Sequence, residues 1–276
     1  MISNQKILCI IIHGSSEHKN RYEQFKTFLN EKNIDVFIED LATHGGNLNQ
    51  EKIHNFTYEE MEQSALKIID DAVNKYPNHK YIIFGHSMGS FIVKDIVYSN
   101  KRIFDGVILS GTNNPKKIDM LLSHFVLKLG SKNKVNKFNN FLVFGFLNVK
   151  SKLKGNGNSW LSTDLQNQKN FINDEKCGNS FTNNSLIAML KFIKNAQDKQ
   201  ILSNFKNKNI PQLIIYGKKD PVTNFGWDIK RMVKNQKKYN IKNQKIISYL
   251  NSKHEILFDV EYKKVEEDII KFLNGF

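Results

Sequence analysis

The sequence contains little cysteine. Only Cys9 and Cys177 occur in 276 residues, and they lie far apart in the chain. Cys9 lies inside a run of apolar residues, where a free thiol is better accommodated than a disulfide framework. We therefore expect two free thiols and a reducing, cytoplasmic compartment.

Long hydrophobic runs are also missing. No apolar stretch reaches the roughly 18 residues that a membrane-spanning helix requires. The short apolar run 7–12 has no cleavage site and is followed at once by His13 and Gly14, so it predicts a strand and not a signal peptide. Hydrophobic residues make up 40% of the chain and aromatic residues 11%, which is enough for a folded core and excludes a disordered chain.

Motifs for cofactors and metals are absent as well. Neither common type of phosphate-binding glycine loop occurs. His254 and Glu255 begin like the zinc motif H-E-x-x-H, but position 258 is Phe. His13 and His18 lie five residues apart, with no carboxylate cluster to complete a ligand set. We therefore expect no cofactor and no metal.

Acidic residues are scarce relative to basic ones, and the net charge is +14. Residues 112–206 hold 15 lysines but only 5 acidic residues, so this third of the chain carries most of the excess. Two explanations remain open: a lysine-rich composition with a solvated surface, or attraction to an anionic partner such as a lipid surface. No DNA- or RNA-binding motif accompanies the charge, so we expect no nucleic-acid partner.

Apolar, β-branched runs alternate with segments of helical spacing. The runs that predict strands are 6–12, 34–40, 80–84, 104–111, 211–217 and 245–250, and those that predict the main helices are 21–33, 57–76, 87–99, 224–236 and 261–273. This order is typical of the α/β class, with a mostly parallel central sheet and helices on both faces.

The alternation is interrupted after residue 111. Residues 112–206 contain no clear strand, whereas 120–130 and 138–149 are apolar with helical spacing. The sequence therefore predicts a discontinuous core made of 1–111 and 207–276. A helical cap or lid, 112–206, is inserted between the two parts.

The stretch Gly85-His86-Ser87-Met88-Gly89 joins a predicted buried strand to a predicted helix. A serine hydroxyl is a weak nucleophile that needs an adjacent base and an exposed position. A sharp strand-to-helix turn provides that exposure, and its crowding favours glycine two residues before and after the serine. This G-x-S-x-G pattern predicts that Ser87 is a catalytic nucleophile.

Asp220 and His254 each follow directly after a predicted strand, in GKKDPV and SKHEILF. Loops at the carboxyl ends of parallel strands meet at the edge where active sites form. The chain order of serine, acid and histidine is that expected for this fold. We therefore predict that His254 is the general base and that Asp220 orients it.

Other candidates fit this order less well. Asp228 and Asp259 do not follow a strand directly, and His44 and His86 precede the acid in the chain. Some related folds place the acid after the preceding strand, but no carboxylate occurs there, where the residues are Thr112, Asn113 and Asn114.

An oxyanion hole needs two backbone N–H groups near the nucleophile. Met88, the residue after Ser87, is one expected donor. The second is expected in the loop after the first strand at Ser15, because the adjacent Gly14 lets the backbone turn toward a bound carbonyl.

Taken together, these motifs resemble the serine-hydrolase branch of the α/β-hydrolase fold that holds monoacylglycerol lipases and bacterial lysophospholipase-like enzymes. HGSSEHKNRY (13–22) is similar to that family's H-G-x-x-E-H-x-x-R-Y, and GHSMGS (85–90) to its nucleophile turn. The segments GKKDPV (217–222) and KHEILFD (253–259) are similar to its acid and histidine loops. WLSTD (160–164) and CGNSFT (177–182) resemble part of the cap in its bacterial members.

The resemblance implies hydrolysis of carboxylic esters of glycerol lipids through an acyl-serine, without a cofactor. Two departures stand out. The family often has a hairpin before its H-G motif, so we expect a sheet shorter by one or two strands. Its D-x-x-G-H-G-x-S loop is only partly kept, since Asp40, His44 and Gly45 match while Thr43 and Asn47 replace the first glycine and the serine.

We therefore expect a serine esterase acting on a lipid monoester, a monoacylglycerol or a lysophospholipid. The alternatives are a short-chain esterase, a thioesterase or an aminopeptidase with the same triad, or a non-catalytic binding protein. The basic cap favours peripheral contact with an anionic membrane. Cap phenylalanines either touch lipid and line the acyl pocket or pack the cap's own core. Expected substrate contacts are His13, Gly14, His86, Phe141 and Phe144, with Leu142 and Phe146 as further lipid-facing candidates.

Overall fold

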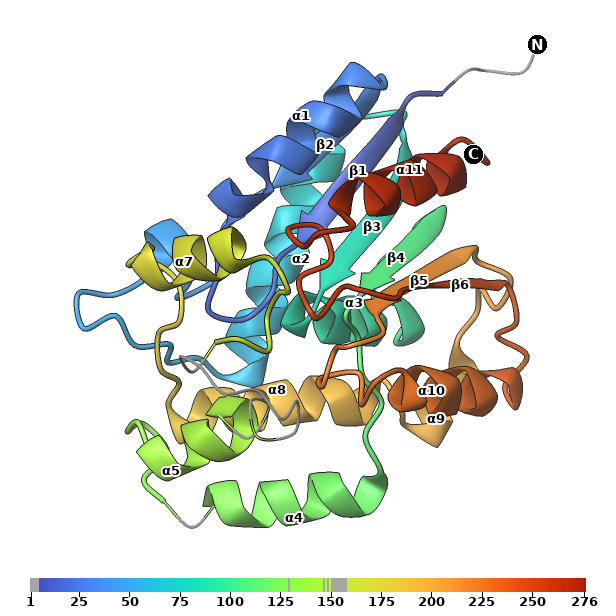
Figure 1. Ribbon diagram of the computed structural model, residues 1–276. Helices are drawn as coiled ribbons and strands as arrows, with labels where there is room; N and C mark the ends of the chain where they lie inside the picture. The colour runs from blue at the N-terminus through green and yellow to red at the C-terminus, as the bar shows by residue number, and fades with distance from the viewer. Residues whose placement is uncertain (1–4, 129, 146, 148, 150–157) are drawn as a thin grey trace.

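A computed structural model describes residues 5–128, 130–145, 147, 149 and 158–276 (Figure 1). A central sheet of six parallel strands runs through the molecule in the order β2-β1-β3-β4-β5-β6. The strands are β1 (Ile7–Ile12), β2 (Ile34–Ile38), β3 (Lys80–His86), β4 (Gly106–Ser110), β5 (Gln212–Gly217) and β6 (Gln244–Tyr249). The predicted fold class is thus confirmed.

Alternating side chains of the strands supply two cores. Leu8, Ile10 and Ile12 of β1 face the larger core, whereas Cys9 and Ile11 face the smaller one. The larger core is covered by α2 (Tyr58–Lys75), α3 (Met88–Tyr98) and α10 (Trp227–Lys237), and the smaller one by α1 (Glu23–Glu31) and α11 (Tyr262–Leu273). Burial on both faces explains why the strands are continuous apolar runs.

The long helix α2 shows how local sequence sets its ends. The Thr57 hydroxyl accepts a hydrogen bond from the N–H of Glu60, and the Glu60 carboxylate accepts one from the N–H of Thr57. This capping box satisfies two N–H groups that the first turn leaves unpaired. Pro77, just beyond the last turn, cannot continue the helix.

Between β4 and β5 the described residues form helices and no strand. They are α4 (Lys117–Lys128), α5 (Lys137–Asn140), a π-helix (Phe141–Gly145), α7 (Leu165–Asn173), α8 (Asn183–Asn195) and α9 (Lys199–Asn204). Figure 1 shows α4, α5 and α8 beyond the end of the sheet toward which the strands point, and α8 packs against α3 and α4. The division into a core and a cap at 112–206 stays a prediction.

The structure corrects several predicted boundaries in this segment. The helix predicted at 120–130 begins at Lys117, and the one predicted at 138–149 is the short α5 followed by the π-helix. Phe146 lies outside the described residues. Both cysteines are free and buried. Across the described part of the chain, no helix combines the length and apolarity needed to cross a bilayer.

Candidate active site

Ser87 lies at the turn where β3 ends and α3 begins. Its backbone has φ +48° and ψ −119°, a conformation that a non-glycine residue adopts only under strain. A Cβ on Gly89 would collide with the carbonyl oxygen of Ile12, and one on Gly85 would lie 2.6 Å from the carbonyl oxygen of Gly89. Gly89 therefore lets the start of α3 pack against the end of β1, and Gly85 lets the end of β3 approach the first turn of α3.

Ser87, His254 and Asp220 form one hydrogen-bonded chain. The Ser87 hydroxyl lies 2.8 Å from His254 Nε2, and His254 Nδ1 lies 2.9 Å from the Asp220 carboxylate. Asp220 and His254 are fully buried, whereas Ser87 is partly exposed. A buried pair that ends at an accessible hydroxyl is the arrangement in which an imidazole can take the serine proton.

The two loops that carry the pair come from neighbouring strands. Asp220 follows β5, and its second carboxylate oxygen accepts a hydrogen bond from the N–H of Val222 at 2.7 Å. His254 follows β6, the strand beside β5. The rival acids lie elsewhere, since Asp228 pairs with Arg231 and Asp259 accepts hydrogen bonds from backbone N–H groups, among them that of Lys253.

Electrostatics shifts the pKa values of the two buried histidines of the site in opposite directions. Burial opposes a charge on His254, but the Asp220 carboxylate, with support from Glu255 and Glu17, outweighs it and raises the pKa of His254. Burial lowers the pKa of His86 to about 4. His254 is therefore the more basic of the two, as a proton acceptor beside Ser87 requires.

Two cavities meet at Ser87. A small one of about 150 Å³ has a mixed lining, with polar side chains such as His86, Glu17 and Glu255 and apolar ones such as Trp160 and Phe181. A large one of about 700 Å³ is lined mainly by apolar side chains of α3, α4 and α8 and of the segment 142–147. Ser15 borders both cavities and Met88 borders the large one. The two predicted oxyanion donors thus lie at the cavity walls beside Ser87.

The predicted substrate contacts divide into two groups. Gly14 and His86 line the small cavity, and Phe144 lines both. His13 lines neither cavity and is wholly buried. Its Nδ1 donates to the carbonyl of Gly14 and its Nε2 accepts from the N–H of Leu41, so both ring nitrogens are occupied. Phe141 is 51% exposed and lines neither cavity. We therefore no longer expect His13 or Phe141 to line a substrate pocket.

The sequence did not predict a buried ion-pair network at the wall of the small cavity. Arg21 donates to Glu17 at 2.8 Å and to both carboxylate oxygens of Glu255 at 2.6 and 2.8 Å. Glu17 also accepts hydrogen bonds from the N–H of Gly14 and the hydroxyl of Tyr22. The signal for it in the sequence was the segment 13–22, whose Glu17 and Arg21 belong to the motif that resembles the family.

The loop after β2 has Thr43 in place of the first glycine of the similar motif. Thr43 stands at that position with φ +59°, in the left-handed region that glycine favours. The Asp40 carboxylate closes the loop by accepting hydrogen bonds from the N–H groups of Lys19 and Gly46, both at 2.8 Å. His44 then stacks on His54, with ring centroids 4.1 Å apart.

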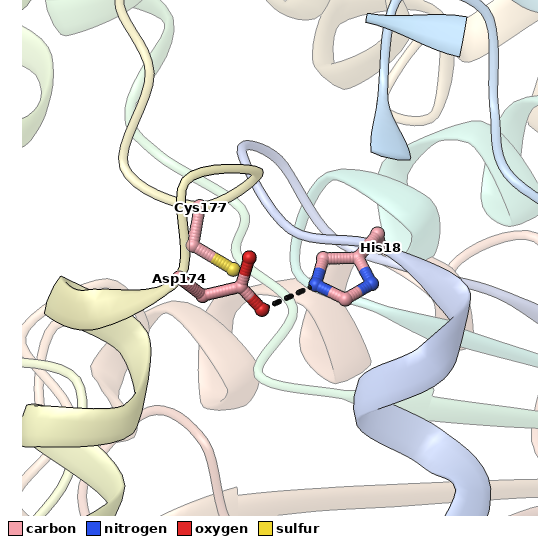
Figure 2. A group of neighbouring side chains, drawn as sticks. All are labelled: His18, Asp174 and Cys177. Atoms are coloured by element: carbon pink, nitrogen blue, oxygen red, sulfur yellow. Dashed lines mark hydrogen bonds and ion pairs between the residues drawn. The ribbon is translucent and has the colours of Figure 1, made fainter. Parts of the chain in front are cut away.

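One group of described side chains could hold a metal ion. His18, Asp174 and Cys177 offer a nitrogen, an oxygen and a sulfur atom that all lie within 4.8 Å of one another. Figure 2 shows the three side chains converging from the loop after β1 and the loop after α7 (Leu165–Asn173). No sequence motif pointed to this group, because 156 positions separate His18 from Asp174.

Comparisons with known proteins place this geometry in a family. The family described as "Serine aminopeptidase, S33" matches residues 3–261. A monoglyceride lipase homolog of Monkeypox virus is 29% identical over 108 residues, which is 39% of this chain and 39% of that relative. A carboxyl esterase from Bacillus coagulans has a TM-score of 0.87 at 24% identity, covering 99% of this chain and 91% of that one.

A variant of monoglyceride lipase from Saccharomyces cerevisiae, solved with a substrate analog, has a TM-score of 0.78 at 14% identity. It covers 99% of this chain and 88% of that one. The structural likenesses confirm the predicted fold, and the family match confirms the resemblance drawn from the motifs. The chain therefore belongs to the α/β-hydrolase family described as "Serine aminopeptidase, S33".

Proposed function

We propose that the protein is a serine esterase that hydrolyses lipid monoesters, monoacylglycerols or lysophospholipids, through an acyl-serine intermediate. The observation that carries the proposal is the continuous contact from Asp220 through His254 to the partly exposed hydroxyl of Ser87. The family match to serine enzymes supports it.

The geometry implies a sequence of proton transfers. His254 takes the proton of Ser87 as the hydroxyl oxygen adds to the ester carbonyl, and the N–H groups of Ser15 and Met88 stabilise the resulting oxyanion. His254 then gives that proton to the leaving alcohol. Water repeats the cycle on the acyl-serine, with His254 accepting its proton and returning it to Ser87. Asp220 stays ionised and stabilises the imidazolium.

The two cavities indicate the substrate class. The large apolar cavity has room for one acyl chain, and the small one, whose lining includes several polar side chains, suits a compact alcohol such as a glycerol moiety. Their junction at Ser87 would place the ester carbonyl between chain and alcohol. The names of the relatives, monoglyceride lipase and its homolog, agree with a single-chain glycerol ester.

The carboxylates near the small cavity argue against an aminopeptidase. An aminopeptidase needs a free carboxylate to bind the substrate's α-ammonium group. Glu17 and Glu255 line the small cavity, but both are paired with Arg21. We expect no turnover of aminoacyl anilides under conditions where esters are cleaved.

Kinetics on p-nitrophenyl esters of rising chain length test the substrate class. We expect kcat/KM to rise from acetate to medium or long chains, since each buried methylene contributes about 0.8 kcal/mol. Leu190→Trp, which fills part of the large cavity, should move the preference to shorter chains. Leu165→Trp, on the exposed face of α7, is the matched control. A preference for acetate that Leu190→Trp leaves unchanged would contradict the lipid assignment.

We further propose that the outer face of α4 contacts anionic membranes. Ile118, Leu121, Leu122 and Phe125 lie on one side of this helix and are each at least 57% exposed. Exposed lysines lie at the ends of this helix and in the segment that follows it, at 116, 117, 128, 132, 134 and 137. The inner side of α4, including Leu127, lines the large cavity, so a bound membrane would lie next to the proposed acyl pocket.

Vesicle sedimentation tests this contact. We expect binding to vesicles that contain phosphatidylglycerol, loss of binding with Leu121→Gln/Phe125→Gln, and no loss with Ile246→Gln, an exposed apolar residue of the edge strand β6. Equal binding of all three proteins, or equal binding to neutral vesicles, would contradict the proposal.

A further inference from the structure

His18, Asp174 and Cys177 combine three metal-ligating atoms at a place where the proposed ester chemistry uses none of them. We propose that these side chains form a binding site for a divalent cation of the zinc type. The site lies between the loop after β1 and the loop after α7 (Figure 2) and shares no residue with the Ser87–His254–Asp220 chain.

The turn after α7 aims two of the ligands at the third. The N–H of Cys177 donates to the carbonyl of Asp174 at 2.9 Å, which folds the segment so that both side chains point the same way. The N–H of Lys176 donates to Asp174 Oδ1 at 2.9 Å, leaving Oδ2 to contact His18 Nε2 at 2.7 Å. The ligand atoms are thus preoriented by the backbone.

The donor set suits zinc better than calcium or magnesium. A thiolate, an imidazole and one carboxylate are ligands that zinc prefers, whereas the harder cations require more oxygen ligands. Bonds of about 2.0–2.3 Å around a tetrahedral ion place ligand atoms about 3.3 Å or more apart. His18 and Asp174 would therefore separate by about half an ångström, and the partly exposed Asp174 can make that movement. A water molecule would complete the shell from its open side.

The local charge favours a cation although the whole chain is basic. Three carboxylates, Glu17, Glu255 and Asp174, lie around the single guanidinium of Arg21 and the imidazole of His18. Arg21 is already engaged by Glu17 and Glu255, so it leaves Asp174 available. A divalent ion bound to the Cys177 thiolate would offset two of the three net negative charges that the carboxylates, the thiolate and Arg21 then carry.

An ion at this site would join two walls of the small cavity. His18 follows Glu17, whose carboxylate holds the N–H of Gly14, and Cys177 precedes Gly178, whose N–H donates to the carbonyl of Ser16 at 3.0 Å. Gly14, Ser16 and Gly178 all line that cavity. The inference rests on the ligand geometry alone and holds whether or not the protein cleaves esters.

Titration of the metal-free protein with Co²⁺, followed by competition with Zn²⁺, tests the site. We expect one ion per chain, with the visible bands of a tetrahedral Co²⁺ ion and the charge-transfer band of a Co–thiolate bond. Cys177→Ala should abolish the charge-transfer band, and His18→Gln or Asp174→Asn should weaken Zn²⁺ binding. Since loss of an outer-shell partner alone weakens metal affinity 10- to 100-fold, each loss of a ligand should cost about 100-fold or more.

Cys9→Ala is the matched control, because Cys9 is the other buried thiol and belongs to the core of the sheet. It should bind Co²⁺ like the wild type, and circular dichroism checks that every variant is folded. Absence of stoichiometric binding to the wild type would overturn the proposal. A charge-transfer band that survives in folded Cys177→Ala, or is lost in Cys9→Ala, would overturn it as well.

Discussion

Arg21 donates to both carboxylate oxygens of Glu255, at 2.6 and 2.8 Å, and thereby ties the start of the chain to the loop that carries His254. The same guanidinium donates to Glu17, whose carboxylate holds the N–H of Gly14. One buried cation therefore connects the loop of the proposed oxyanion donor Ser15 with the loop of the proposed base. Residues 13–17 and 254–255 should move as one unit.

Glu255→Gln tests this connection through the pH profile. Glu255 helps to raise the pKa of His254, so its neutralisation should lower that pKa. Because the base must be neutral to accept a proton, the acidic limb of kcat/KM should move to lower pH. Loss of part of a buried ion pair should also lower the free energy of unfolding by about 3 kcal/mol. Glu267→Gln, on the exposed face of α11, is the control and should leave the pH profile unchanged. If Glu255→Gln had the same pH profile as this control, the connection would be contradicted.

Asp220→Asn tests the buried carboxylate. The amide can keep the packing but cannot stabilise an imidazolium or favour the required tautomer of His254, so kcat should fall by about 10⁴-fold. Asp228→Asn is the control, because Asp228 pairs with Arg231 and His254 contacts Asp220 instead. Steady-state kinetics on one ester checks both. Similar losses in the two variants would argue against the assigned acid.

Thr43→Gly should stabilise the protein. Thr43 is β-branched and holds a φ of +59°, and its buried hydroxyl has no hydrogen-bond partner among the described residues. Relief of this strain, about 1–3 kcal/mol, should exceed the entropy that glycine adds to the unfolded chain, about 1 kcal/mol. Chemical denaturation should show a gain of about 1 kcal/mol. Destabilisation would mean that the threonine side chain contributes packing that outweighs its strain.

His54→Phe should make the protein less sensitive to acid. Burial lowers the pKa of His54 from 6.5 to about 4, so the unfolded state binds more protons between these values, and stability falls as the pH drops from 6.5 toward 4. His54 stacks between His44 and Phe181, so a phenyl ring at this position would keep an aromatic contact with both. The variant should lose stability less steeply in denaturation curves between pH 6.5 and 5. If the free energy of unfolding falls with pH as steeply as in the wild type, groups other than His54 cause the acid sensitivity.

The sequence predicted those parts of the site that depend on local patterns. Apolar runs located all six strands, and a residue directly after a parallel strand must lie at the carboxyl edge, which is why Ser87, Asp220 and His254 could be expected to meet. The glycines around Ser87 marked the sharp turn. These predictions depend only on the period of the hydrophobic pattern and on the shared direction of the parallel strands.

Other features depend on tertiary packing and could not be predicted in this way. The pairing of Arg21 with Glu255 joins residues 234 positions apart. His13 was expected to contact substrate, but the carbonyl of Gly14 and the N–H of Leu41 occupy its two ring nitrogens. Phe141 begins a π-helix and is half exposed, whereas the apolar spacing of 138–149 left open whether it lines a pocket, contacts lipid or packs within the cap.

Reaction with a fluorophosphonate, followed by intact-mass measurement and peptide mapping, tests the central claim most directly. The account predicts one adduct per wild-type chain, located at Ser87, and none on folded Ser87→Ala. An unlabelled wild-type protein, or equal labelling of wild type and Ser87→Ala, would contradict it.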